Sequence, residues 1–209
     1  MLGFTLSKFS LLILVVAIFG IVSFFTLQLT ESLKSKALTD MLANNASIAS
    51  EMMSSPSYCD ALLVKIPETV KLSTSEMYYV MRISTQPVPN SEKSYLIFSA
   101  ASRASPEQTV AASSSPTTAS VTIYDNSYSN PVDAQEGILL DPSARSSELS
   151  DAFYLVKEID SQGKVLLFVF PCAISGGIQS NCRNAKKAVG SKVHASDLVK
   201  KFKCDEENE

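Results

Sequence analysis

The stretch FSLLILVVAIFGIVSFFTLQLT, residues 9–30, decides the fold of this chain because it contains no ionisable side chain and is mostly Leu, Ile, Val, Phe and Ala. A helix of that length rises about 30 Å, which matches the hydrocarbon core of a bilayer. A buried core helix would need a larger domain around it. A cleaved secretory signal has a shorter apolar run, of about 7 to 15 residues. The stretch therefore predicts a transmembrane helix.

The helical pattern continues beyond the apolar stretch as an amphipathic one. Neither Gly nor Pro occurs between residues 21 and 55, and Pro56 is the first clear stop signal. Asn44-Asn45 is the weakest point, because Asn has a poor helix propensity. We predict one long helix over residues 1–55, with an apolar face in its second part formed by Leu33, Ala37, Met41, Ile48 and Met52.

The chain after Pro56 has the composition of a β domain. Short β-branched or aromatic runs are bounded by Pro, Asn, Ser and Asp, which is typical of strands. Asp160 to Gly163 joins two such runs as a hairpin turn, and the second run is apolar on both faces, so it should be central. The predicted strands cover residues 77–83, 94–98, 120–124, 153–159 and 164–170. The fold class is therefore α+β: a long N-terminal helix, transmembrane and then amphipathic, followed by a mainly antiparallel β domain over 56–209.

Two segments of this domain are less regular. Residues 99–120 are mostly Ser, Ala, Thr and Pro, which is typical of a flexible or glycan-bearing loop or of an edge strand around residues 109–111. Near the end, Ser196 can cap a short helix whose Leu198 and Phe202 share a face, and an acidic tail follows.

The cysteines place the β domain outside the cytoplasm. Lys8 lies before the apolar stretch and Lys34 and Lys36 lie after it, so the positive charges alone do not orient the helix. All four cysteines follow the apolar stretch, and their even number suits an oxidising compartment. Asn45-Ala46-Ser47 is an N-glycosylation acceptor sequence, which makes Asn45 a candidate glycan site. We expect one local disulfide across a Gly-containing loop and, by elimination, a second between remote cysteines: Cys172 with Cys182, and Cys59 with Cys204.

The sequence offers little that would support catalysis or cofactor binding. His194 is the only histidine, and no phosphate-cradling Gly-rich motif is present. The cysteines lack the close pairs of a zinc site, and residues 125–130 lack the alternating acidic ligands of a calcium loop, so a plain turn is expected there. With 18 Lys and Arg against 21 Asp and Glu, nothing favours nucleic acid as a partner. We expect no enzyme activity, cofactor or metal.

Gly3-Phe4-Thr5-Leu6 stands directly before the long apolar helix, which continues as an amphipathic one. This arrangement resembles the N-terminus of type IV pilins and related archaeal pilin-like proteins, and the similarity covers about the first 55 residues. The resemblance implies cleavage after Gly3, so that Phe4 becomes the first mature residue. It also implies a helix that leaves the bilayer for the centre of a filament, with the globular domain, often a small β-sheet or an immunoglobulin-like sandwich, facing outward. Bacterial pilins carry Glu at the fifth mature position, where this chain has Lys8.

Two functions are therefore expected from the sequence. The first is a structural subunit of a cell-surface filament that self-associates through residues of its N-terminal helix: Phe4, Leu6, Lys8, Leu11, Leu14, Phe19, Gly20 and Phe25. The second is a surface protein that stays in the membrane, for which Lys8 marks the cytoplasmic face, and presents its β domain to a surface ligand. Simple contact with lipid would satisfy the same apolar side chains in either case.

Overall fold

The fold was determined as a computed structural model, which describes residues 2–72, 76–125, 127–144, 150–160, 162–174 and 182. The predicted terminal helix around Ser196, as well as His194, lies outside these residues. The elements are α1 (Leu2–Ser54), β1 (Cys59–Lys65), β2 (Thr69–Lys71), β3 (Glu76–Pro87), β4 (Ser94–Ser102), β5 (Thr109–Thr117), β6 (Ser120–Ile123), β7 (Ile138–Leu140), β8 (Ala152–Ile159) and β9 (Val165–Cys172). The predicted α+β class, a long N-terminal helix followed by mainly antiparallel strands, is confirmed.

Helix α1 is uninterrupted over 53 residues, including Asn44 and Asn45, the weakest point of the helical pattern. Its end follows from the sequence, because Pro56 disfavours helical geometry in the residue before it. The amide of Ser55 closes the last turn by donating to the carbonyls of Glu51 and Met52 at 3.0 and 3.3 Å. The chain divides into two compact units, 1–36 and 37–209, so the last part of α1 belongs to the β domain.

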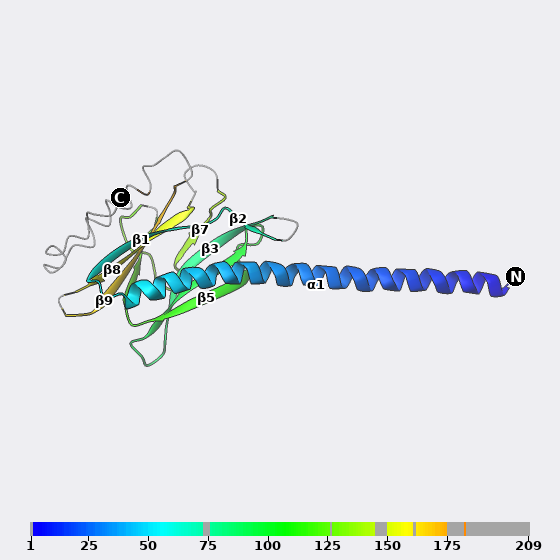
Figure 1. The fold of residues 1–209 in the computed structure, drawn as a ribbon, viewed down its shortest axis with the longest axis horizontal. Helices are drawn as coiled ribbons and strands as arrows, with labels where there is room; N and C mark the ends of the chain where they lie inside the picture. Colours follow the sequence, from blue (N-terminus) through cyan, green and yellow to red (C-terminus); the bar gives the residue numbers. More distant parts are fainter. Residues whose placement is uncertain are drawn as a thin grey trace. The chain divides into compact units, whose positions relative to one another are not determined.

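The strands form two sheets (Figure 1). The four-stranded sheet has the order β1-β8-β9-β6, and the five-stranded sheet has the order β2-β3-β4-β5 with β7 also pairing with β3. Strand β6 runs parallel to β9, whereas the other described pairs are antiparallel. The immunoglobulin-like form implied by the resemblance is not confirmed.

The β8–β9 hairpin matches the prediction closely. Asp160 Oδ1 accepts hydrogen bonds from the amides of Gln162 and Lys164, each at 2.8 Å. Gly163 has φ of +80°, a conformation that glycine adopts without the strain other residues incur. As expected, the doubly apolar strand β9 is central, between β8 and β6.

Most of residues 99–120 lies in strands, joined by a turn over 103–108, rather than in the flexible loop that was one expectation. Strand β4 extends to Ser102, and β5 pairs with it antiparallel, with a bulge between Ala100 and Ala101. The edge-strand alternative is therefore confirmed over a longer range than predicted. The physical reason is that small side chains on alternate positions of β5 are buried on the domain's inner side: Ala111, Ser115 and Thr117.

One hydrophobic core joins the inner faces of both sheets to α1. The rings of Phe98 on β4 and Phe153 on β8 lie 6.1 Å apart between their centres. In Figure 1 the cyan end of α1 lies over the strands, and its contribution to this core comes from Leu38, Leu42, Ala46, Ala49 and Met52. The last part of α1 is thus a structural member of the β domain.

Candidate assembly helix and its junction with the β domain

The first part of α1 presents apolar side chains that are left uncovered within the described residues. Leu11, Leu14, Phe19 and Phe25, all predicted to act in membrane insertion or assembly, are 59–69 % exposed. Phe4, Leu6 and Lys8 lie within the helical backbone of α1. The candidate cleavage site, Gly3-Phe4, lies at the start of the same helix. The described helix is long and apolar enough to cross a membrane, which makes it a candidate membrane anchor.

Two hydroxyl groups of this segment are satisfied by the helix itself. Thr26 Oγ1 donates to the carbonyl of Val22 and Thr30 Oγ1 donates to that of Thr26, both at 2.8 Å. Such bonds to the preceding turn allow a hydroxyl to enter an apolar medium. A Cβ added at Gly20 would meet no atom within 4 Å. The surface at this point is therefore open to close approach by another helix.

The second part of α1 buries a face slightly rotated from the predicted one. Leu38, Leu42 and Ala49 are fully buried, whereas the predicted Ala37, Met41 and Ile48 are only partly buried against the core. Met52 is buried, as its place in the pattern suggested. The rotation brings Asn45 into the buried face, at 5 % exposure.

The predicted glycan at Asn45 does not fit this fold. Asn45 Nδ2, the atom that would carry the sugar, contacts Met81 Sδ on β3 at 3.6 Å inside the interface between helix and sheet. A glycan is a bulky, hydrated group that requires a surface position. The acceptor sequence is present, but the helix turns its side chain into the core, where Asn45 is not accessible to a glycan.

A buried lysine joins the end of α1 to β8. Lys157 is 1 % exposed, and its Nζ donates a hydrogen bond to the carbonyl of Ser55, just past the last turn of the helix. A cation at this place also interacts favourably with the negative end of the helix dipole. The backbone contributes a second link, because the amide of Ile159 donates to the carbonyl of Tyr58 at 2.9 Å. Lys157 has no local sequence signal for this role, because a single lysine in a strand is typical of a solvated position.

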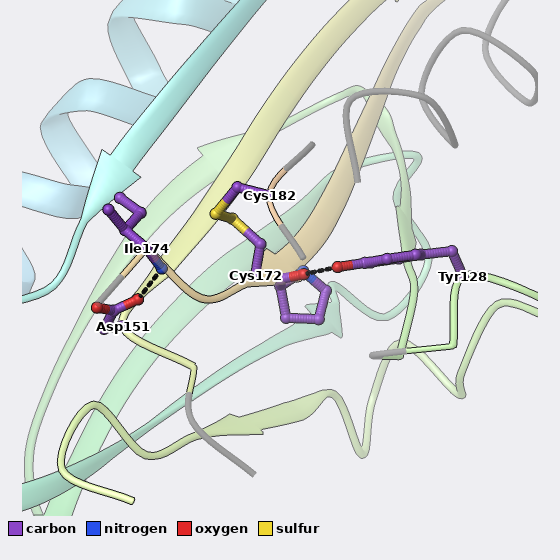
Figure 2. Close-up of a disulfide and its surroundings, with 6 residues drawn as sticks. Tyr128, Asp151, Cys172, Ile174 and Cys182 are labelled. Carbon is purple, nitrogen blue, oxygen red and sulfur yellow. Dashed lines mark hydrogen bonds between the residues drawn. A yellow bond between two sulfur atoms is a disulfide. The ribbon is translucent and has the colours of Figure 1, made fainter. Parts of the chain in front are cut away.

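The cysteines support the disulfide predictions in part. Cys172 and Cys182 are bridged, with Cα atoms 4.8 Å apart, as expected from their spacing (Figure 2). Cys59 at the start of β1 is also disulfide-bonded. Its predicted partner, Cys204, lies outside the described residues.

Two hydrogen bonds order the chain around the Cys172–Cys182 bridge, as Figure 2 shows. The amide of Ile174 donates to Asp151 Oδ1 at 2.6 Å, and the Tyr128 hydroxyl donates to the carbonyl of Pro171 at 2.7 Å. Tyr128 adopts a left-handed φ of 56°, which is rare for a bulky residue. Burial, with a smaller contribution from Asp125, raises the pKa of the Tyr128 hydroxyl to about 12.

The remaining candidate groups show structural roles. Burial also raises the pKa of Tyr79, whose hydroxyl donates to the carbonyl of Pro67 at 2.7 Å. Asp125 Oδ1 accepts bonds from the amide and hydroxyl of Ser127, which is the plain turn expected over 125–130. Within the described ranges, no three His, Cys, Asp or Glu side chains gather in a way that could hold a metal ion.

Comparison of the chain with protein-family models, with curated proteins and with solved structures found no match.

Proposed function

We propose that this chain is a pilin-like structural subunit of a cell-surface filament, assembled through the exposed apolar segment of α1. The segment would first lie in the bilayer as a single-pass anchor, with the β domain outside the cytoplasm. On assembly its side chains would exchange lipid contacts for contacts with helices of other copies. Such packing depends on van der Waals contact and close backbone approach, rather than on water exclusion alone.

One observation carries this proposal: the exposed apolar segment and the buried face of the β domain belong to the same uninterrupted helix. A domain that must search for ligands away from a membrane gains reach from a flexible linker rich in Gly, Ser or Pro. Here no linker separates the candidate span from the domain, because α1 continues directly into core residues such as Leu38 and Leu42. A subunit held in a filament by its helix has no need for such a linker.

Lys8 favours the second candidate, a permanently anchored surface protein. In a filament core, an unpaired ammonium at the fifth position of a mature chain that begins at Phe4 would cost several kcal/mol. In a permanent anchor, the same lysine extends to the inner membrane face and needs no partner. The filament proposal therefore requires an acidic group of another copy near Lys8. Glu31 is the nearest acid in the sequence, 23 residues after Lys8. The Glu31 of another copy would lie beside Lys8 if the two helices were shifted by about 35 Å along their axes.

Substitution of Gly20 by Leu separates the two candidates. The single chain has room for the larger side chain, since a Cβ at position 20 meets no atom within 4 Å. Close helix packing in a filament would be obstructed. We expect Gly20→Leu to reach the membrane at the normal level but to reduce surface filaments at least tenfold, measured by electron microscopy and by the protein in the sheared fraction.

Val22→Leu is the matched control, because position 22 lies about 200° around the helix from position 20 and already carries a branched side chain. It should leave filaments unchanged. Normal filaments in Gly20→Leu would refute close packing at this glycine. A wild-type chain that forms no filaments and remains in the membrane would support the permanent anchor instead.

A further inference from the structure

The exit of α1, residues 55–58, is a short connection to β1 that is held against β8. The carbonyl of Ser55 accepts a hydrogen bond from the buried Lys157, and the carbonyl of Tyr58 accepts one from the amide of Ile159 at 2.9 Å. Cys59, the next residue, is the first of β1 and is disulfide-bonded. Two hydrogen bonds and a covalent link therefore act within five consecutive residues.

The first residues of β1 support the exit of α1 through their pairing with β8. Among the described strands β1 pairs with β8 alone, so its ends are places where the sheet can open locally. The register places Cys59 opposite Glu158 and Asp60 opposite Lys157. Opening of these first pairs would admit water around Lys157 and break the hydrogen bond from the Ile159 amide. The state of β1 at this end therefore decides whether the exit stays attached.

The other disulfide acts on the far end of the same strands. Cys172 is opposite Ala152 on β8, and Ala152 is in turn opposite Lys65, the last residue of β1. Lys65 comes six positions after Cys59, which is about 20 Å along an extended strand. Of the two disulfides, the one at Cys59 therefore adjoins the exit of α1, and the one between Cys172 and Cys182 does not.

We propose that the Cys59 disulfide is a redox-sensitive switch that controls the attachment of the exit of α1 to β8. The bridge restricts the conformations that an opened β1 can adopt, so it lowers the entropy gained on opening. With the bridge intact, the hydrogen bonds at Ser55 and Tyr58 persist. With the bridge reduced, the start of β1 opens and the last turn of α1 opens with it. Reduction of the Cys172–Cys182 bridge has no such effect.

This switch concerns the attachment of the helix to its own domain, so it goes beyond the proposed function and applies to a filament subunit and to a permanent anchor alike. The bridge would form outside the cytoplasm by exchange with an oxidised dithiol: two thiols of the chain lose two protons and two electrons, and the disulfide of the oxidant becomes two thiols. Leu38 and Leu42 are fully buried in the core and keep the earlier turns of α1 in place. The effect is therefore confined to the last turn.

Amide hydrogen exchange of the full chain in detergent micelles, measured by mass spectrometry, tests the switch. The readout is the peptide over residues 51–55, in which the Ser55 amide donates to the carbonyls of Glu51 and Met52. We expect at least tenfold faster exchange of this peptide in Cys59→Ser than in the parent. Dithiothreitol should have the same effect on the folded parent, because it reduces a disulfide to two thiols and itself becomes a cyclic disulfide. It should add nothing in Cys59→Ser.

The matched control is the double variant Cys172→Ser/Cys182→Ser, which removes the other bridge. Its peptide over residues 51–55 should exchange at the parent's rate, and dithiothreitol should accelerate that exchange as in the parent. The peptide over residues 165–170 of the central strand β9 should exchange equally in all three chains, which shows that the domain remains folded.

Three results would overturn the proposal. The first is exchange at the parent's rate over residues 51–55 in both Cys59→Ser and the reduced parent. The second is equal acceleration in Cys59→Ser and in the double variant, because that would indicate general loosening of the domain. The third is alkylation of Cys59 in the parent without prior reduction, because the switch requires this cysteine to be bridged.

Discussion

At the scale of single residues, buried polar groups define how the domain holds its helix. Lys157 and Asn45 are both more than nine-tenths buried, and each contacts a partner across the junction between α1 and the sheets. Burial of such groups is favourable only when they are hydrogen-bonded. Ser115 Oγ on β5 is an exception among the described residues, because it is buried without a hydrogen-bond partner.

Replacing Lys157 by Met should lower the free energy of unfolding by about 1–2 kcal/mol. The variant keeps the apolar stem but removes a charge-assisted hydrogen bond to Ser55, typically about 1.5–3 kcal/mol, while relief of the buried charge offsets part of that loss. Chemical denaturation measures the change, and faster amide exchange in the last turn of α1 should accompany it. Exposed Lys164→Met is the control and should change stability by less than about 0.5 kcal/mol. A Lys157→Met chain as stable as the parent would show that the hydrogen bond from Lys157 to Ser55 does not contribute to the stability of the fold.

Tyr128 predicts loss of stability at alkaline pH. Its pKa rises from an ordinary 10.0 to about 12 in the folded state, so the folded protein binds this proton more tightly than the unfolded chain. Its contribution is therefore complete below pH 10 and is lost as the pH rises from about 10 to 12. Denaturation midpoints across this range should fall more steeply in the parent than in Tyr128→Phe. Identical slopes in the two proteins would show that Tyr128 does not cause the loss of stability. The buried Tyr79, whose pKa is also raised, should account for part of the slope that remains in Tyr128→Phe.

At the scale of elements, two glycines with similar backbone angles differ in their surroundings. Gly163 in the β8–β9 turn has φ of +80°, and a Cβ added there would meet no atom within 4 Å. Gly137, which precedes β7, has φ of +68°, and a Cβ there would collide with the Ile83 carbonyl and lie 2.7 Å from Ser84 Cβ. Ile83 cannot easily move, because it is paired on one side with Phe98 and on the other with Ile138.

Alanine substitutions at these glycines should therefore differ. Gly163→Ala should cost about 1–2 kcal/mol, the strain of a left-handed conformation. Gly137→Ala adds the collision with β3 and should cost about 2 kcal/mol more. Thermal or denaturant unfolding of the two variants tests whether Gly137→Ala loses more stability than Gly163→Ala. Equal costs would mean that the backbone at Ile83 yields more readily than its two-sided pairing suggests.

Local patterns were sufficient to predict the elements whose signals lie within a few residues. The β8–β9 turn could be predicted because Asp160 and Gly163 supply the turn chemistry themselves, and α1 because no Gly or Pro interrupts it between residue 21 and Pro56. Strands β2 and β7 escaped prediction because each has three residues and exists only through pairing with β3.

The candidate site was predictable to a smaller extent. The disulfide between Cys172 and Cys182 followed from spacing, and the exposed apolar helix from composition. The burial of Asn45 depends on helix rotation against the sheet. Leu38, Leu42 and Ala49 share its face at helical spacings, so a stricter count of periodicity would have given this signal. The role of Lys157 depends on a contact across 102 positions of sequence and had no local signal.

At the scale of the whole molecule, the chain combines an apolar helical segment with a β domain that incorporates the end of the same helix. We propose that the first unit serves membrane insertion and then filament packing, while the second is displayed outside the cell.

The N-terminal residue of the protein recovered from its native cell surface tests the filament proposal most directly. Intact mass and N-terminal sequencing should be performed on sheared filaments and on the membrane fraction in parallel. We predict a filament fraction in which the chain begins at Phe4, because removal of residues 1–3 would release the helix for assembly, with Lys8 near an acid of another copy. A chain that retains Met1 and occurs only in the membrane fraction would contradict the filament and identify a permanent anchor.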